Sequence, residues 1–260
     1  MSRLLERLVA PLLMIAAIGF IGIPIVAIFL RVSPSALLDG LTSEAARDAL
    51  ALSFKTTLIS LVVIILVGTP VANVLVTHPI RGRDAITTLL ELPLVMPPAV
   101  AGIALLSAFG ARGAIGGPLG LELPFTTTAV ILAQIFVASP FYLRQAQAAF
   151  EGLGGQTLEA ARACGASPTR TLVRIAAPLA ARGLLTGAVL AWARALGEFG
   201  ATLIFAGSFQ GVTQTAPLAI YGELDNDIPA ALALSAVLVV ISFAVLIGVK
   251  IGARRWIRPL

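Results

Sequence analysis

The sequence predicts an all-α integral membrane protein with six transmembrane helices, and two observations carry this prediction. First, 58% of its 260 residues are hydrophobic and only 12% are charged, whereas soluble domains hold about 25% charged and roughly 45–50% apolar residues. The mean hydropathy is +0.99. Second, the apolar residues gather into charge-free runs at least as long as the ~20 residues that a helix needs to cross the hydrocarbon core.

Five charge-free runs predict five spans, and a further apolar run contains two charges. The first run is long for a signal-peptide core and no small-residue cleavage site follows it closely, so we expect it to be retained. The run with charges is the fifth in order, where Arg194 and Glu198 interrupt it. The predicted spans are residues 8–30, 56–77, 92–111, 123–143, 183–206 and 228–249.

The segments between these spans leave no room for a second folded domain. The longest, residues 144–182, has fewer than forty residues, so residues 1–260 are predicted to form a single transmembrane domain. Most Lys and Arg residues fall on the side that holds both termini. Because basic residues collect in cytoplasmic loops, we expect both termini and the 144–182 loop to be cytoplasmic, with the chain in the cell membrane. The basic residues on the outside are Arg31, Arg47, Lys55 and Arg112.

The composition excludes several classes of function. The net charge of +5 raises nucleic acid as a partner, but the basic cytoplasmic loops account for it. With one cysteine, Cys164, and one histidine, His78, the chain cannot assemble a disulfide framework, a metal cluster or a histidine-based catalytic site. The sequence has no G-x-x-x-x-G-K-[ST] phosphate loop, so an ATP-driven function needs a partner subunit. We expect no catalytic residue, metal site or cofactor in this chain.

The most polar stretch, residues 159–178, lies in the cytoplasmic loop. A carboxylate and three alanines open it, Gly165 permits the chain to break, and Ser167 followed by Pro168 is a typical helix start. The stretch therefore predicts two short helices joined at a corner, with a small face that a partner protein can approach closely. One alternative is an amphipathic segment whose arginines contact lipid phosphates. A DNA-binding helix-turn-helix is disfavoured, because the segment is tethered between two spans.

The third span contains a proline-rich stretch. Pro93, Pro97 and Pro98 each remove a backbone donor and bend or interrupt the helix, and non-helical backbone at this depth is tolerated where protein or a water cavity covers it. Gly102 then allows close helix contact. The stretch is either part of a pore lining or a structural kink beside a packing glycine.

Polar residues inside the fourth and fifth spans also have two interpretations. Arg194 and Glu198 are one turn apart, and Arg194 lies about 17 Å along the fifth span from Gly183 at the helical rise. Charges at such depth are costly and usually face an interior or a cavity, often paired. Arg194 could draw an anion inward, or the two residues could form a local ion pair or a pair across a dimer interface. Gln134 could line a path or bond to neighbouring helices.

The cytoplasmic stretch resembles the motif of ABC importer permeases, E-A-A, three residues, G, nine residues, I-x-L-P. Here the sequence reads EAA at 159–161, G at 165 and IAAP at 175–178, with alanine where leucine is usual. In that family the motif forms coupling helices that dock into a groove of the ATP-binding subunit. The resemblance thus implies a coupling role for Glu159, Ala160, Ala161, Gly165, Ile175 and Pro178.

Three other stretches resemble the oxyanion branch of this family. Residues 193–207 (ARALGEFGATLIFAG) and 213–221 (TQTAPLAIY) are similar to its fifth span and following outer loop, the second most closely to the molybdate/tungstate group. Residues 91–102 (ELPLVMPPAVAG) resemble its third-span motif. Sulfate and thiosulfate permeases share GEFG and are the near alternative. The candidate pathway or gate residues are Pro93, Pro97, Pro98, Gly102, Arg194 and Glu198.

The resemblance also implies an assembly. The expected fold is the type I ABC importer permease bundle with cytoplasmic coupling helices, working as a homodimer with the pore between the two copies. Two partner subunits bind ATP and Mg, and an extracytoplasmic binding protein delivers molybdate or tungstate. A rival from another class, the self-sufficient secondary transporter, normally shows ion-coupling carboxylates and inverted repeats. Only Glu91 and Glu198 are acidic residues at or within a span, and no repeat is found.

Overall fold

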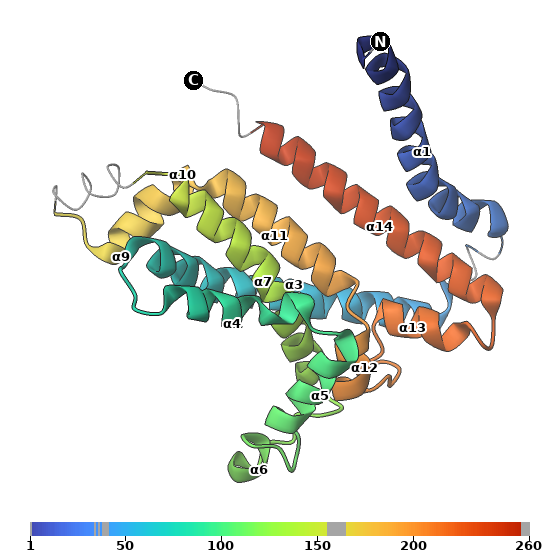
Figure 1. The fold of residues 1–260 in the computed structure, drawn as a ribbon. Coiled ribbons are helices and arrows are strands. Elements are labelled where there is room, and N and C mark those ends of the chain that lie inside the picture. Colours follow the sequence, from blue (N-terminus) through green and yellow to red (C-terminus); the bar gives the residue numbers. More distant parts are fainter. Residues whose placement is uncertain (1, 34, 36, 38–41, 155–164, 256–260) are drawn as a thin grey trace.

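The structure, a computed structural model, describes residues 2–33, 35, 37, 42–154 and 165–255. The regular secondary structure in these ranges is helical (Figure 1). Four helices are long and apolar enough to cross a membrane. They are α1 (Ser2–Arg31), α3 (Glu44–Thr77), α7 (Thr127–Glu151) and α14 (Ile228–Arg255).

Two bent pairs of helices also pass the length and hydropathy test for a span. In the first pair, α4 (Arg83–Val95) and α5 (Pro98–Phe109) are bent by 117°. In the second pair, the segment Pro168–Leu179 and α11 (Ala181–Leu196) are bent by 81°. With each pair counted as one span, the described residues hold up to six, the number that the sequence predicts.

The third predicted span, residues 92–111, is not one helix. Two adjacent prolines donate no backbone hydrogen bond, and proline disfavours the helical conformation in the residue before it. Met96 accordingly has φ −69° and ψ 132°, and Pro97 has φ −55° and ψ 137°. The interruption that the prolines predict is confirmed, and the chain turns there to begin α5.

The fifth predicted span, residues 183–206, is also divided. Helix α11 ends at Leu196, and a separate helix α12 (Gly200–Ala206) follows after three residues. Two further short helices are α6 (Gly116–Leu119) and α13 (Ala216–Glu223).

The centre of the bundle is formed by α3, α7 and α11, which cross one another (Figure 1). Small residues bring their backbones close, as is common between membrane helices. A Cβ on Gly187 of α11 would lie 2.9 Å from the Cβ of Gln145, and one on Gly68 of α3 would lie 2.8 Å from the Tyr142 ring of α7. These three helices therefore form a tightly packed centre around which the broken helices are arranged.

A buried hydrogen-bond network joins α3 to α7. The side chain of Gln134 is 1% exposed; its Nε2 donates to Thr56 Oγ1 over 3.1 Å, and its Oε1 accepts from Ser60 Oγ over 3.0 Å. Ser53, on the same helix, accepts the backbone N–H of Ala216 at the start of α13 over 2.7 Å. Of the two roles that the sequence leaves open for Gln134, the structure shows bonding to a neighbouring helix.

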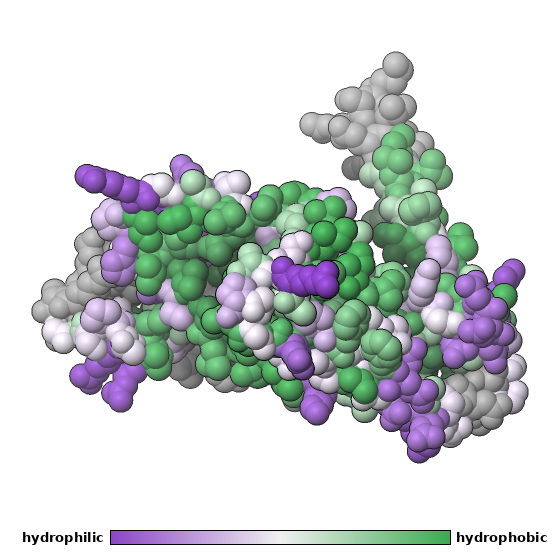
Figure 2. Space-filling model, turned by 90° about the horizontal axis from the view of Figure 1, so that it is seen from below, coloured by the Kyte–Doolittle hydropathy of each residue, from purple (hydrophilic) through white to green (hydrophobic). Residues whose placement is uncertain are grey.

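Helix α1 stands apart from the centre. None of its span, Val9–Arg31, is buried, and the helix that it packs against is α14 (Figure 1). Its exposed side chains are apolar, and in Figure 2 hydrophobic residues cover much of the visible face of the molecule. The described chain thus presents an outer surface suited to hydrocarbon.

Candidate functional site

The segment that the sequence predicts to be cytoplasmic begins a helix where the sequence predicts it, at Pro168. Gly165 has φ +78°, a left-handed conformation that favours glycine. Ser167 caps the next helix, since its hydroxyl accepts the backbone N–H of Arg170 over 3.3 Å, and Pro168 occupies the first helical position. Three other residues expected in the motif, Glu159, Ala160 and Ala161, lie outside the described residues.

The helix that follows contains a π-helical turn. It comprises α9 (Pro168–Thr171), the π-helix Leu172–Ala176 and α10 (Ala177–Leu179). The N–H of Ala177 donates to the carbonyl of Leu172, five residues earlier. Pro178 supplies the physical reason, because its ring clashes with the carbonyl four residues before it and cannot continue the α-helical ladder. Pro178 and the half-buried Ile175, both in the motif, thus belong to a locally widened helix.

One side of this segment is anchored and the other is exposed. Ala176 and Ala180 are buried in the cluster that contains Phe150 of α7. Val173 and Leu179, by contrast, are 61% and 57% exposed. Arg170 and Arg174 are exposed as well. The segment, which we call the coupling segment (residues 165–180), therefore offers an outer face that combines apolar and basic side chains, while its inner face is fixed to the bundle. The segment is followed by α11 across the 81° bend.

The second group of candidate residues lies where the two broken helices meet. A Cβ on Gly200, at the start of α12, would lie 2.5 Å from the Cβ of Pro98, at the start of α5. A Cβ on Gly102 would lie 2.7 Å from the Cβ of Ile204 and 3.0 Å from the carbonyl oxygen of Ala201. The close contact predicted for Gly102 is confirmed, and the two stretches resembling oxyanion importers pack against each other.

The two charges of the fifth span form a local ion pair. Arg194 Nη1 lies 2.7 Å from Glu198 Oε2, although without hydrogen-bond geometry. The side chain of Glu198 is 1% exposed and that of Arg194 is 29% exposed. Glu198 Oε1 accepts the N–H of Ala201 over 2.8 Å, which caps α12. Glu198 therefore holds the break between α11 and α12 in place.

Because Glu198 both caps α12 and pairs with Arg194, we expect its replacement to lower the free energy of unfolding by an amount that depends on the substitution. Replacing Glu198 with Ala removes the cap and leaves Arg194 without its partner, and we expect a loss of about 1–3 kcal/mol in the free energy of unfolding. Glu198→Gln keeps an acceptor for Ala201 and should lose less. Thermal unfolding of the purified variants measures both. A Glu198→Ala protein as stable as the unaltered chain would contradict the capping role.

Two ion pairs between α4 and α7 were not predicted from the sequence. Arg83 pairs with Glu151 over 2.6 Å, and Arg144 pairs with Glu91 over 2.8 Å. The partners are far apart along the chain, so no local spacing signals them. The pairs join the first residue and the second half of α4 to α7. Pro93 lies within this helix, and Pro97 is exposed at the turn that follows.

No group of three His, Cys, Asp or Glu side chains able to hold a metal ion occurs in the part of the chain that the structure describes. The described residues do hold two broken helices packed on glycine, a partly buried ion pair beside them, and the coupling segment with its exposed apolar and basic side chains.

Comparison with known proteins places this arrangement in context. Residues 64–258 match the family described as binding-protein-dependent transport system inner membrane component. The chain is 45% identical over 243 residues to the molybdenum transport system permease protein ModB of Mycobacterium bovis, covering 92% of this chain and 91% of the relative. It is 31% identical over 213 residues to a probable sulfate transport system permease protein of Nephroselmis olivacea, covering 80% and 75%.

A solved structure shares the fold. The chain superposes with a TM-score of 0.74 on a bacterial ABC transporter involved in the import of the acidic polysaccharide alginate, at 16% identity and with 97% of each chain covered. The all-helical fold is thus that of type I ABC importer permeases, as the sequence predicts.

Proposed function

Since this chain belongs to the family of binding-protein-dependent transport system inner membrane components, we propose that it is the permease subunit of an ATP-driven ABC importer for molybdate or tungstate. The observation that carries the choice of substrate is the similarity to a molybdenum permease across nearly the whole chain. The relative named for sulfate is more distant, and sulfate is therefore the alternative substrate. The chain is a multi-pass membrane protein.

The assembly that we propose follows from the same family. Two copies of this chain enclose the pore, and two ATP-binding subunits hold ATP and Mg and dock on the coupling segments. An extracytoplasmic binding protein delivers the oxyanion, and both termini face the cytoplasm. The exposed Val173 and Leu179 support the docking role, because exposed apolar side chains beside the motif offer a surface for a partner to bury. The chain itself catalyses no bond chemistry.

Uptake into proteoliposomes tests the proposal. The chain is reconstituted with its ATP-binding subunit, and ATP is supplied on the side of that subunit. The binding protein is supplied on the opposite side, together with an equimolar mixture of molybdate, tungstate and sulfate. We expect molybdenum or tungsten to accumulate inside while sulfur stays outside, as counted by elemental mass spectrometry. Omitting the ATP-binding subunit is the control and should abolish accumulation.

The other outcomes separate the alternatives. Accumulation of sulfur in place of molybdenum and tungsten would keep the importer class and change the substrate. Uptake that persists without the ATP-binding subunit would identify a self-sufficient secondary transporter and contradict the coupling role of the segment.

A further inference from the structure

Helix α4 is held to the bundle differently from the helix that follows it. None of the 13 residues of α4 is buried, whereas α5 buries Ala101, Gly102 and Leu105. The exposed side chains of α4 include the apolar Ile86 and Leu89. The contacts that hold α4 in place therefore come from the side that faces α7, the helix against which it packs.

Charged contacts dominate this side of α4. The Nη2 group of Arg83 donates to Glu151 Oε1 over 2.6 Å, and Arg144 Nε lies 2.8 Å from Glu91 Oε1. Between the two ion pairs, the partly buried Leu90 packs against the central hydrophobic cluster. We call these two ion pairs the ionic lock, since they fasten α4 to α7 on either side of a small apolar contact.

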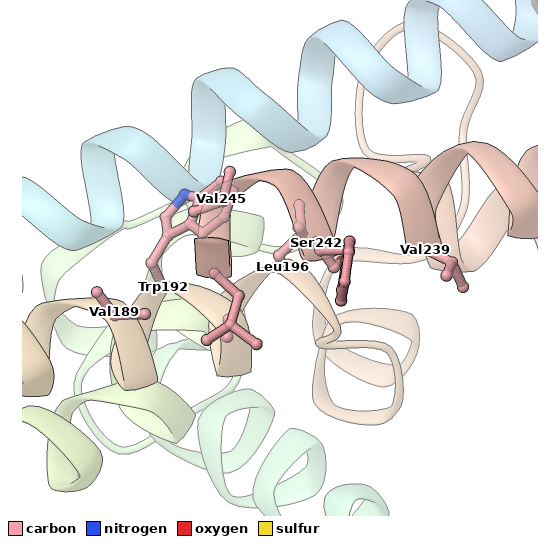
Figure 3. A pocket seen from close by; sticks show the side chains of 9 residues that line it. Val189, Trp192, Leu196, Val239, Ser242 and Val245 are labelled. Atoms are coloured by element: carbon pink, nitrogen blue, oxygen red, sulfur yellow. The ribbon is translucent and has the colours of Figure 1, made fainter. Parts of the chain in front are cut away.

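The contact between α11 and α14 is of the opposite kind. There Val189, Trp192 and Leu196 of α11 lie opposite Val239 and Val245 of α14 (Figure 3). The side chains that line this contact carry no charge. Two helices of this protein can thus meet through apolar side chains, so the charges between α4 and α7 are a particular feature of that pair.

The order of the charges fixes the register of α4. On α4 the cation comes first and the anion second, and on the antiparallel α7 the order along the same direction is reversed. A slide of α4 by about two turns, roughly 10 Å, would place Arg83 beside Arg144, where like charges repel. The ionic lock therefore opposes sliding, and α4 can leave α7 more easily by swinging away from it.

The ionic lock is weak enough to open. Its side chains are 38% and 54% exposed in the first pair and 62% and 29% exposed in the second. Ion pairs with this much solvent around them shift an equilibrium by up to about fivefold each. The lock therefore favours the docked position of α4 without making it permanent.

The chain offers a turn about which α4 can swing. Met96 and Pro97 are extended, with ψ 132° and 137°, so the helix is interrupted between α4 and α5. On the far side of this turn, the contact of Pro98 with Gly200 fixes the start of α5 against α12. A movement of α4 is therefore taken up at the turn while α5 stays in place.

We propose that α4 is a movable arm of the permease. The ionic lock holds it on α7 in this structure, and α4 swings away about the Met96–Pro97 turn in another state of the transport cycle. The arm lies at the predicted cytoplasmic end of the spans, because Glu91 directly precedes the charge-free run 92–111 and Arg144 directly follows the run 123–143. This inference rests on the proposed transport function.

A covalent bridge in place of one ion pair tests the movement. Cys164 is replaced by Ser, Arg83 and Glu151 are each replaced by Cys, and the full chain is assembled with its ATP-binding subunit in proteoliposomes. A bifunctional methanethiosulfonate joins the two thiols, and a denaturing gel checks that the bridge lies within one chain. We expect ATP-driven uptake of the oxyanion mixture to fall at least tenfold and to return with dithiothreitol.

A monofunctional methanethiosulfonate is the control for the bridge and should not block uptake. Undiminished uptake by fully bridged protein would show that α4 stays docked throughout the cycle, which would overturn the proposal.

Amide hydrogen exchange of the unaltered assembly needs no variant to fold. The exchange of residues 83–95 is compared between the resting assembly and the assembly trapped with ATP and vanadate. We expect these amides to exchange at least twofold faster in one of the two states, with α5 equal in both. Equal exchange of α4 in an assembly that takes up oxyanion would overturn the movable arm and leave the transport function intact. Absence of uptake by the unaltered assembly would instead contradict the transport function, and the arm with it.

Charge exchange assigns the effect to the ionic lock. Arg144→Gln should raise the exchange of the α4 amides about two- to fivefold, and the double variant Glu91→Arg with Arg144→Glu should restore slow exchange. Val245→Ala, in the apolar contact between α11 and α14, should leave α4 unchanged. If α4 exchanges as fast in the double variant as in Arg144→Gln, the attraction between the charges does not hold the helix and the lock is overturned.

Discussion

Gly165→Val is expected to abolish most ATP-driven uptake while leaving the amount of protein in the membrane unchanged. The residue has φ +78°, and a Cβ at this position would meet nothing within 4 Å. The cost is therefore conformational: left-handed backbone costs an L-residue about 1–2 kcal/mol, and a β-branched residue is the least tolerant. Relief of that strain redirects the chain at the start of the coupling segment, just before the helix cap Ser167, and we expect uptake to fall about tenfold.

Two control variants separate a role of Gly165 in coupling from the general cost of a side chain at a left-handed backbone position. Gly165→Asn should keep most of the uptake, because asparagine tolerates the left-handed region. Gly82→Val is the second control: this glycine has φ +76° and also has open space around it, but it lies outside the motif. ATP-driven uptake in proteoliposomes, normalised to reconstituted protein, measures all three. Uptake by Gly165→Val equal to that of Gly82→Val would contradict a special role for Gly165 in coupling.

The second large effect is expected at the contact between α5 and α12. Gly102→Val would bring a Cβ within 2.7 Å of Ile204 Cβ and 3.0 Å of the Ala201 carbonyl oxygen. Helix backbone cannot yield as a flexible side chain does, and overpacking typically costs about 1–3 kcal/mol. Such a loss should lower the melting temperature by roughly 5–10 °C and separate the two broken helices, so uptake should fall as well.

Gly22→Val is the matched control for this contact. Gly22 is also inside a helix, α1, but a Cβ there would meet nothing within 4 Å. Thermal unfolding followed by size-exclusion chromatography compares the two variants. We expect Gly22→Val to unfold close to the unaltered protein. A Gly102→Val protein of equal stability would show that α5 and α12 can move apart freely, which would remove the packing role of Gly102.

The sequence predicts best those features that depend on neighbours along the chain. Apolar runs locate the membrane helices, the Ser167 and Pro168 pair marks a helix start, and the spacing of Arg194 and Glu198 allows their ion pair. An apolar run is a property of one continuous segment, and the groups in the other two cases are separated by about one helical turn or less, so local physical chemistry decides the outcome.

Features that depend on packing between distant segments could not be predicted in the same way. Gln134 had two interpretations until the position of α3 was known, and the partners of Arg83 and Arg144 are set by how α4 lies on α7. The stretches around Gly102 and Gly200 were singled out separately, and only the fold shows that they touch. The coupling role of Gly165 is a prediction that rests on the resemblance and awaits its test.

The isolation of α1 has a consequence for biosynthesis. The helix packs against α14, which is translated almost two hundred residues later, so about 10–40 s pass between them at usual rates of synthesis. Throughout this interval α1 must persist in lipid by itself, which its internally satisfied backbone and apolar side chains permit. A ribosome that stalls before α14 would thus leave α1 inserted but undocked, and a membrane protease that recognises unpartnered helices could tell the truncated chain from the finished one.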